Sequence, residues 1–197
     1  MEKRIIRAKD DLYSLLFLLT PGDTKAELDT LLNAFLEFEQ YYNEDAPLEK
    51  VLPKLTKVYG DRYKGYTLKQ LCQEMHNYYR GNKTFTLQQE LFAKPNMQNY
   101  PMTPEHADYL FMKNKSELVN LDDVKGRIAA EGALPYPPGV FIVAPGEKWS
   151  DIDQKYFEVL VGAIERFPGF VPEIQGVYWD QKADGKIRVQ AEVLKEN

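Results

Sequence analysis

The sequence is poor in the residues that build disulfides and metal sites. It contains one cysteine, Cys72, so no internal disulfide can form, which is typical of a protein from a reducing compartment. It has only two histidines, His76 and His106, and neither CxxC nor HExxH occurs. GxGxxG and GxxxxGK[ST] are also missing. These absences argue against a zinc site, a dinucleotide fold and a P-loop.

Long apolar runs and blocks of positive charge are missing too. The longest apolar run near the start, Leu15–Leu19, is far too short to cross a bilayer, and the charged start MEKRIIRAKDD has no apolar core of a signal peptide. The net charge is −5, with 25 basic and 30 acidic residues and no basic stripe. We therefore expect neither a membrane nor a nucleic acid as partner, and a cytoplasmic location.

The first half of the sequence predicts one strand and several helices. Residues 12–20, LYSLLFLLT, are typical of a buried strand that ends at the turn signal Pro21-Gly22. A helix capped by Asp23 or Thr24 should run to about residue 42. A short helix follows to residue 55, kinked at Pro53, and then a helix capped by Thr67 up to about residue 80.

The second half predicts a mixture of helices and short, mostly antiparallel strands. Helical segments are TLQQELFAK, a segment begun by Thr103-Pro104, and DIDQKYFEVLVGAIERF after Ser150. Strand signals are SELVNL, GRIAAE, VFIVA, GVYWDQ and KIRVQAEVL, the last two joined by a hairpin turn at residues 183–185. The polar tract 94–101 is a candidate junction between two parts, although a boundary a few residues earlier fits equally well.

The most unusual segment is EGALPYPPGVFIVAPGE, residues 131–147. It places four prolines and three glycines around the apolar run VFIVA. Prolines and glycines favour turns, so the run between them should form a short strand. The segment is interpreted either as a structural corner or as the wall of a site.

No complete catalytic constellation is visible. Cys72 and His76 are four residues apart on one helix face, but a metal site would lack further ligands, and the pair is best explained as ordinary helix residues. His106 is a candidate general base, although a surface histidine is the simpler interpretation. The acid pairs Asp10-Asp11 and Asp122-Asp123 are typical of solvated loops. Seven tyrosines suggest either subunit contact or simple half-burial: Tyr41, Tyr42, Tyr59, Tyr63, Tyr66, Tyr78 and Tyr79.

Several strings, in the same order, resemble the bacterial ornithine/lysine/arginine decarboxylases. GRIAAEGALPYPPGVFIVAPGEKW at 126–149 resembles a signature of that family's C-terminal region. LYSLLFLLTPG, GYTLKQLCQEMHNYY and PGFVPEIQGVY resemble further family segments. The stretch 102–139 is more similar to the ornithine branch than to the lysine branch. The resemblance departs from the family at Ala8-Lys9, where the family usually has Glu-Lys.

The resemblance implies a fold-type I enzyme that uses pyridoxal 5'-phosphate to convert L-ornithine to putrescine and CO2. The family's Schiff-base lysine lies in a Ser-x-His-Lys motif, and this sequence has no His-Lys dipeptide. We therefore expect residues 1–84 to be the end of the small domain and residues 85–197 to be the α+β C-terminal domain. The expected partners are the rest of the decarboxylase polypeptide and further copies in a homodimer or larger homo-oligomer.

The same resemblance suggests residues near the substrate channel, and one favoured function and three alternatives stay open. The channel candidates are Arg127, Glu131, Tyr136 and Glu147. The favoured function is the C-terminal region of an ornithine decarboxylase, which shapes the active-site entrance and subunit assembly. The alternatives are a stand-alone binding or assembly module, a fragment of a lysine or arginine decarboxylase, and a small enzyme that uses His76 or His106.

Overall fold

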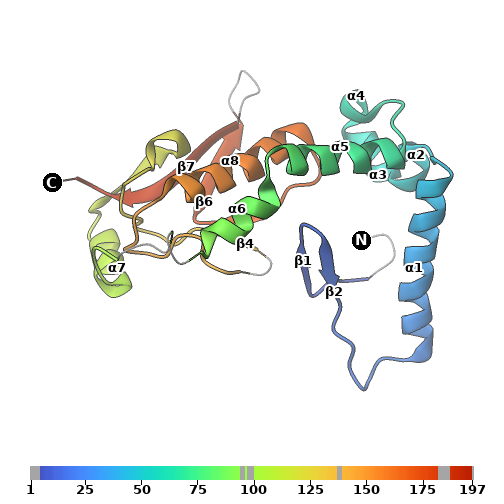
Figure 1. Ribbon diagram of the computed structural model, residues 1–197, viewed down its shortest axis with the longest axis horizontal. Helices are drawn as coiled ribbons and strands as arrows, with labels where there is room; N and C mark the ends of the chain where they lie inside the picture. The colour runs from blue at the N-terminus through green and yellow to red at the C-terminus, as the bar shows by residue number, and fades with distance from the viewer. Residues whose placement is uncertain (1–4, 94–95, 97–99, 137–138, 182–186, 197) are drawn as a thin grey trace. The chain divides into compact units, whose positions relative to one another are not determined.

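The chain folds into two compact units, Met1–Tyr78 and Tyr79–Asn197. The computed structural model describes residues 5–93, 96, 100–136, 139–181 and 187–196 (Figure 1). Helix α5 passes from the first unit into the second. The division predicted after residue 84 lies a few residues further along the chain.

The first unit consists of one small hairpin followed by helices. Its elements are β1 (Lys9–Asp11), β2 (Ser14–Leu16), α1 (Lys25–Asn43), α2 (Leu48–Val51), α3 (Pro53–Val58), α4 (Gly60–Tyr63) and α5 (Leu68–Gly81). Thr24 caps α1 as predicted: its side chain accepts the Glu27 amide, and the Glu27 carboxylate accepts the Thr24 amide. Pro53 breaks the predicted second helix into α2 and α3, and α4 was not predicted.

The prediction of a buried strand over residues 12–20 is wrong. Only residues 14–16 of this run are extended, and they pair with β1 in an isolated antiparallel hairpin. Leu15, Leu16, Leu18 and Leu19 stay exposed, from 48% for Leu16 to 75% for Leu18, and Leu12 and Phe17 are only half-buried. An apolar run shows that a segment needs to be covered, but burial also requires a second layer. Among the described residues of this unit, α1 covers the run only in part, through the contact between the rings of Phe17 and Phe35.

The second unit is an α+β domain with short antiparallel strands, as predicted. Its elements are α6 (Thr84–Leu91), α7 (Pro104–Met112), β3 (Ser116–Asn120), the 3-10 turn η2 (Leu121–Asp123), β4 (Leu134–Tyr136), α8 (Asp151–Arg166), β5 (Glu173–Gln175), β6 (Val177–Gln181) and β7 (Ile187–Leu194). The cap of α7 is the predicted Thr103, and α8 begins after Ser150 as predicted, with Ser150 itself as its cap. The predicted hairpin turn 183–185 and most of the predicted junction 94–101 lie outside the described residues.

The core of the second unit lies between α8 and the sheet β3-β7-β6 (Figure 1). Phe157, Leu160 and Val161 recur at helical spacing on α8, and Val189, Ala191 and Val193 alternate along β7. Helix α6 packs against α8 through the same core. A smaller cluster, which includes Ala107 of α7 and Leu194 of β7, covers the opposite face at the end of the sheet.

Two of the predicted strands are wrong. GRIAAE makes only isolated bridges, Ile128 to Lys148 and Ala129 to Val193, and VFIVA makes only the bridge from Val143 to Ala133. The regular strand is β4, which contains Pro135 and pairs with β5. An isolated ladder of three residues tolerates proline, which is excluded only from the middle of a sheet. Proline in this segment therefore occurs within a strand as well as beside it.

Candidate functional site

The four predicted channel residues all lie in the loop-rich segment 126–147 of the second unit. Arg127 is engaged inside its own unit. Its Nη2 donates to Glu117 Oε1 at 2.7 Å and to the Leu194 carbonyl at 3.0 Å, and the side chain is only 16% exposed. These contacts hold segment 126–130 against β3 and β7, which gives Arg127 a structural role in this unit.

Glu131 joins two of the segments that resemble the family, residues 126–149 and residues 168–178. Its Oε2 accepts a hydrogen bond from the hydroxyl of Tyr178, which lies 47 residues further along the chain on β6. This hydrogen bond to a carboxylate, together with burial, raises the pKa of Tyr178 to about 12. The phenol therefore stays protonated at neutral pH and fixes the orientation of the Glu131 carboxylate.

The backbones of the same two motifs touch at a pair of glycines. Gly176 has φ +73, and a Cβ atom there would lie 2.0 Å from the Gly132 carbonyl oxygen. A Cβ atom on Gly132 would lie 2.3 Å from the Phe141 ring. Gly176 has no room for a side chain because the atoms it would meet are backbone, whereas at Gly132 the Phe141 ring would have to move. The close approach of the two backbones accompanies the pairing of β4 with β5, in which Tyr136 lies opposite Glu173.

Tyr136 is a surface residue on this β4–β5 ladder. Its ring packs beside Gly139, and 49% of the residue is exposed. Val140, Phe141 and Val171 of the two motifs are also about half exposed. We call these four residues the exposed motif residues. They are available to contact another surface, whereas the backbone beneath them is tightly fixed.

Glu147 stabilises a turn. Its Oε2 accepts the backbone amide of Ala144 at 2.7 Å, and a hydrogen bond to its carboxylate raises the pKa of Tyr100. The Ala144 bond closes the Pro145-Gly146 turn, where Gly146 has φ +86. The four predicted channel residues therefore fall into two pairs. Arg127 and Glu147 make stabilising contacts within the second unit, whereas Glu131 and Tyr136 lie beside the Gly132–Gly176 contact and on the β4–β5 ladder.

The other polar candidates are separate from these residues. His76 is exposed on α5 with its ring 6.1 Å from that of Tyr13, and burial raises the pKa of the Cys72 thiol, which disfavours a nucleophilic thiolate. His106 is exposed on α7 and stacks on Tyr109. The described residues contain no cluster of three His, Cys, Asp or Glu side chains that could hold a metal ion.

A network around Arg62 was missed by the sequence analysis. Arg62 donates to Glu74 at 2.9 Å and to the Tyr66 hydroxyl at 2.7 Å, and Tyr66 donates to Glu74 at 2.9 Å. The guanidinium also lies over the rings of Tyr63 and Tyr66. Tyr63 is fully buried. Part of the tyrosine-rich pattern therefore packs inside the first unit. The position of Arg62 among tyrosines in the sequence is the signal that could have indicated this network.

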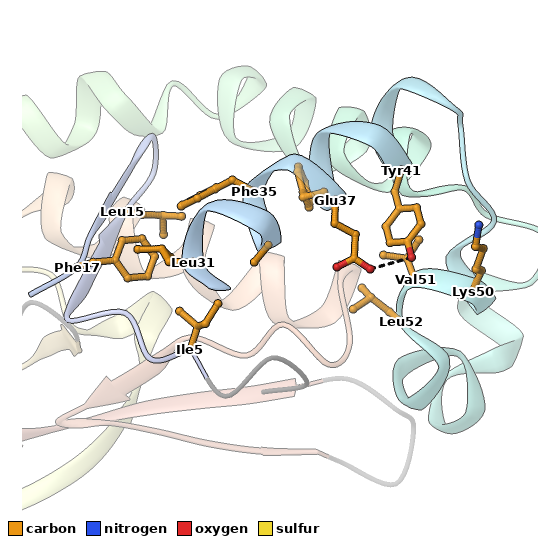
Figure 2. Close-up of a pocket in the computed structure, with 12 residues that line it drawn as sticks. Ile5, Leu15, Phe17, Leu31, Phe35, Glu37, Tyr41, Lys50, Val51 and Leu52 are labelled. Atoms are coloured by element: carbon orange, nitrogen blue, oxygen red, sulfur yellow. Dashed lines mark hydrogen bonds between the residues drawn. The ribbon is translucent and has the colours of Figure 1, made fainter. Parts of the chain in front are cut away.

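The first unit contains a cavity of about 640 Å³ between β2, α1 and α2 (Figure 2). One end is lined by apolar side chains that include Leu15, Phe17 and Leu31. At the other end Tyr41 donates to Glu37 at 2.9 Å, and Lys50 lies 5.0 Å above the Tyr41 ring. The two charged groups near the cavity are thus engaged with Tyr41, and its remaining lining is apolar.

Among the described helices, none is long and apolar enough to span a membrane. The family profile "Orn/Lys/Arg decarboxylase, C-terminal domain" matches residues 85–195. An inducible ornithine decarboxylase of Lactobacillus sp. (strain 30a) is 49% identical over 180 residues, 91% of this chain and 25% of that protein. The ornithine decarboxylase of Haemophilus influenzae is 49% identical over 193 residues, 98% of this chain and 27% of that protein. The chain spans about a quarter of the length of these curated relatives.

Solved structures of lysine decarboxylases share the fold. Constitutive lysine decarboxylase of E. coli superposes with a TM-score of 0.86 at 29% identity, over 98% of this chain and 27% of that one. Lysine decarboxylase A from Pseudomonas aeruginosa superposes with a TM-score of 0.88 at 31% identity, over 98% of this chain and 26% of that one. The profile match, the relatives and the structures therefore agree on one family.

Proposed function

Because the chain belongs to the Orn/Lys/Arg decarboxylase family, we propose that it is the C-terminal part of an ornithine decarboxylase. The carrying observation is the identity of 45–49% to ornithine decarboxylases, against 29–33% to lysine and arginine decarboxylases. The parent enzyme uses pyridoxal phosphate in the cytoplasm to convert L-ornithine to putrescine and CO2, for polyamine synthesis or acid response. Residues 1–84 complete its small domain, and residues 85–197 form its C-terminal domain.

The substrate assignment is tested on the full-length enzyme. Purified parent protein is assayed for CO2 release from L-ornithine, L-lysine and L-arginine. A kcat/KM at least tenfold higher for ornithine supports the assignment. A preference for lysine or arginine would make the chain part of a different decarboxylase, and no turnover of any of the three would favour a non-catalytic assembly module.

We propose that the described residues of this chain lack a complete pyridoxal phosphate site. The family's Schiff-base lysine follows a histidine, and the sequence has no His-Lys pair. Lys50 lies at the cavity of the first unit, but that cavity is mostly apolar and its charged groups are engaged with Tyr41. We therefore propose that the isolated chain is inactive and binds no cofactor. A cofactor absorbance band that survives desalting of a chain–cofactor mixture would contradict this.

The first unit provides a surface for the rest of the polypeptide. None of the side chains of α1, all of which the structure describes, is buried, although the helix carries a long apolar stripe. Five of its large apolar residues are 40–57% exposed: Leu28, Leu32, Phe35, Leu36 and Phe38. Soluble monomers rarely expose so large a patch. We assign its cover to the remaining three-quarters of the decarboxylase length, which precedes this region in the family.

A charge introduced on α1 tests whether the apolar stripe is covered in the full-length enzyme or faces solvent. Leu32→Glu should raise the solubility of the isolated chain, because it breaks an exposed apolar stripe, and should lower the melting temperature of the full-length enzyme, because it buries a charge. Thr30→Glu is the matched control, since Thr30 lies on the opposite face of the helix. Equal melting temperatures for the two full-length variants would exclude a buried stripe.

The exposed motif residues are proposed to shape the entrance to the active site. Two features support this: the side chains of Tyr136 and Phe141 are about half exposed, and the backbones near them approach closely at Gly132 and Gly176. In the full-length enzyme, Tyr136→Ala and Glu131→Gln should alter KM for ornithine more than Tyr109→Ala, an exposed tyrosine on α7. Unchanged KM and kcat in both motif variants would leave these residues with a structural role only.

A further inference from the structure

The second unit has a cavity that the proposed decarboxylase function does not use. It lies between α7 and the end of the sheet and has a volume of about 590 Å³. Its floor is apolar and is formed by Met102 and Leu110 on one side and by Ile128 and Leu194 on the other. A volume of this size is within the range of small-molecule sites.

The rim of the cavity is strongly cationic. Four of its residues are positively charged, Lys115, Arg127, Lys148 and Lys195, and one is an acid, Glu196. The lining therefore carries a charge of +3 (four positive minus one negative, histidine not counted), and Glu117, which pairs with Arg127 beside the cavity, lowers the local sum to +2, whereas the whole chain carries −5. Charge of this sign, collected against the overall balance, creates a local field that attracts anions.

Backbone pairing brings these lysines together. The Lys195 amide donates to the Lys115 carbonyl at 3.0 Å, and the next amide, that of Leu194, donates to the Ile128 carbonyl at 2.8 Å. Ile128 in turn bridges to Lys148. The three lysines thus lie on neighbouring backbone segments, and hydrogen bonds between these segments fix the relative positions of the lysine Cα atoms.

Arg127 leaves one donor for a ligand. Its Nη2 is satisfied by Glu117 and the Leu194 carbonyl. Its Nε is buried and has no hydrogen-bond partner among the described residues, although Glu196 Oε1 lies 3.3 Å away. Glu196 is 80% exposed, so its carboxylate is easily displaced from this ion pair. An anionic oxygen that enters the cavity can accept from this buried Nε.

We propose that this cavity binds a small organic anion that carries two or more negative charges, phosphate or carboxylate, on an apolar body. The charged groups meet Lys115, Lys148, Lys195 and Arg127 at the rim, and the apolar body covers the floor. Binding of this kind weakens as salt concentration rises, because the rim is exposed to solvent. The inference concerns binding alone and does not depend on the proposed decarboxylase activity.

The test is calorimetric titration of the 197-residue chain with three probes. ATP carries phosphates on an apolar base, benzene tricarboxylate carries carboxylates on an apolar ring, and inorganic tripolyphosphate carries charge alone. Saturable binding of ATP or of benzene tricarboxylate, tighter than that of tripolyphosphate, supports the proposal, and the tighter of the two identifies the charged group. Absence of saturable binding at millimolar probe, or equal binding of tripolyphosphate, overturns it.

Charge reversals locate the binding. Lys148→Glu and Lys195→Glu should each weaken the tighter probe by about tenfold, because a repulsion replaces an attraction at the rim. Lys155→Glu is the matched control, since Lys155 is exposed on α8 and does not line the cavity. Circular dichroism confirms that the variants are folded. An equal loss in the control, or no loss in either rim variant, would place the binding elsewhere and overturn the proposal.

Discussion

Substitution of Gly176 by alanine should be among the most damaging small changes to the second unit. A Cβ atom there would lie 2.0 Å from the Gly132 carbonyl oxygen, and contacts below 3.0 Å are essentially never seen. The two backbones would have to separate by about 1 Å, which strains the three-residue ladder between β4 and β5. The neighbouring atoms are backbone, so no side chain can turn aside to relieve the contact.

The magnitude follows from two separable costs. A positive φ costs a non-glycine residue about 1 to 2 kcal/mol. Loss of the β4–β5 hydrogen bonds adds about 1 kcal/mol for each bond. We expect Gly176→Ala to lower the free energy of unfolding by roughly 3 to 5 kcal/mol. Gly126→Ala is the matched control, because Gly126 has φ +77 but open space around its Cβ position, and it should cost only about 1 to 2 kcal/mol.

The assay is urea denaturation followed by tryptophan fluorescence. Both tryptophans, Trp149 and Trp179, belong to the second unit, and Trp149 is almost fully buried, so the signal reports on that unit. The midpoint and slope give the free energy of unfolding of each variant. Equal destabilisation by the two alanines would refute the reasoning, because it would mean that φ alone, and not the contact between motifs, sets the cost.

Three further predictions concern hydrogen bonds and caps. The raised pKa of Tyr178, about 12, means that the stabilisation from its bond to Glu131 is present below pH 10 and is lost as pH rises toward 12; Glu131→Gln should move phenolate formation, followed by absorbance, to lower pH, and an unchanged titration would contradict this. Ser150→Ala should cost about 1 kcal/mol in urea denaturation by removing the α8 cap, and Ser150→Thr should cost less; equal losses would argue against capping. Arg62→Lys should lower the helical melting temperature more than Arg80→Lys, because lysine cannot reproduce the paired contacts to Tyr66 and Glu74; equal shifts would exclude the network.

Helix starts could be predicted from the sequence because their causes are local. Thr24 and Thr103 cap their helices as expected, and α8 begins after Ser150 as expected, since a cap is a contact between residues three apart. The same local signals identified β6 and β7 as strands. The family could also be predicted, because several segments that resemble it occur in the same order along the sequence. The profile match and the relatives confirm this prediction.

Burial and strand pairing could not be predicted in the same way. Leu15 to Leu19 look like a core strand, but their exposure depends on what else covers them, which a run of residues does not contain. VFIVA looks like a strand, yet the ladder formed at Leu134–Tyr136, because pairing depends on a partner almost 40 residues away in β5. The Arg62 network and the Glu131–Tyr178 bond also join distant residues and left only weak traces in the sequence.

The position of β7 between β3 and β6 has a consequence for how the second unit folds. Ser116 pairs with Leu194, 78 residues further along the chain, and the same strand pairs with β6 and bridges to Ala129. While the protein is being synthesised, the sheet cannot close until β7 has been made, and the apolar face of α8 lacks its cover until then. Contacts between such distant residues form slowly. The nascent second unit therefore exposes apolar surface until β7 has been made, and aggregation competes with its folding during that time.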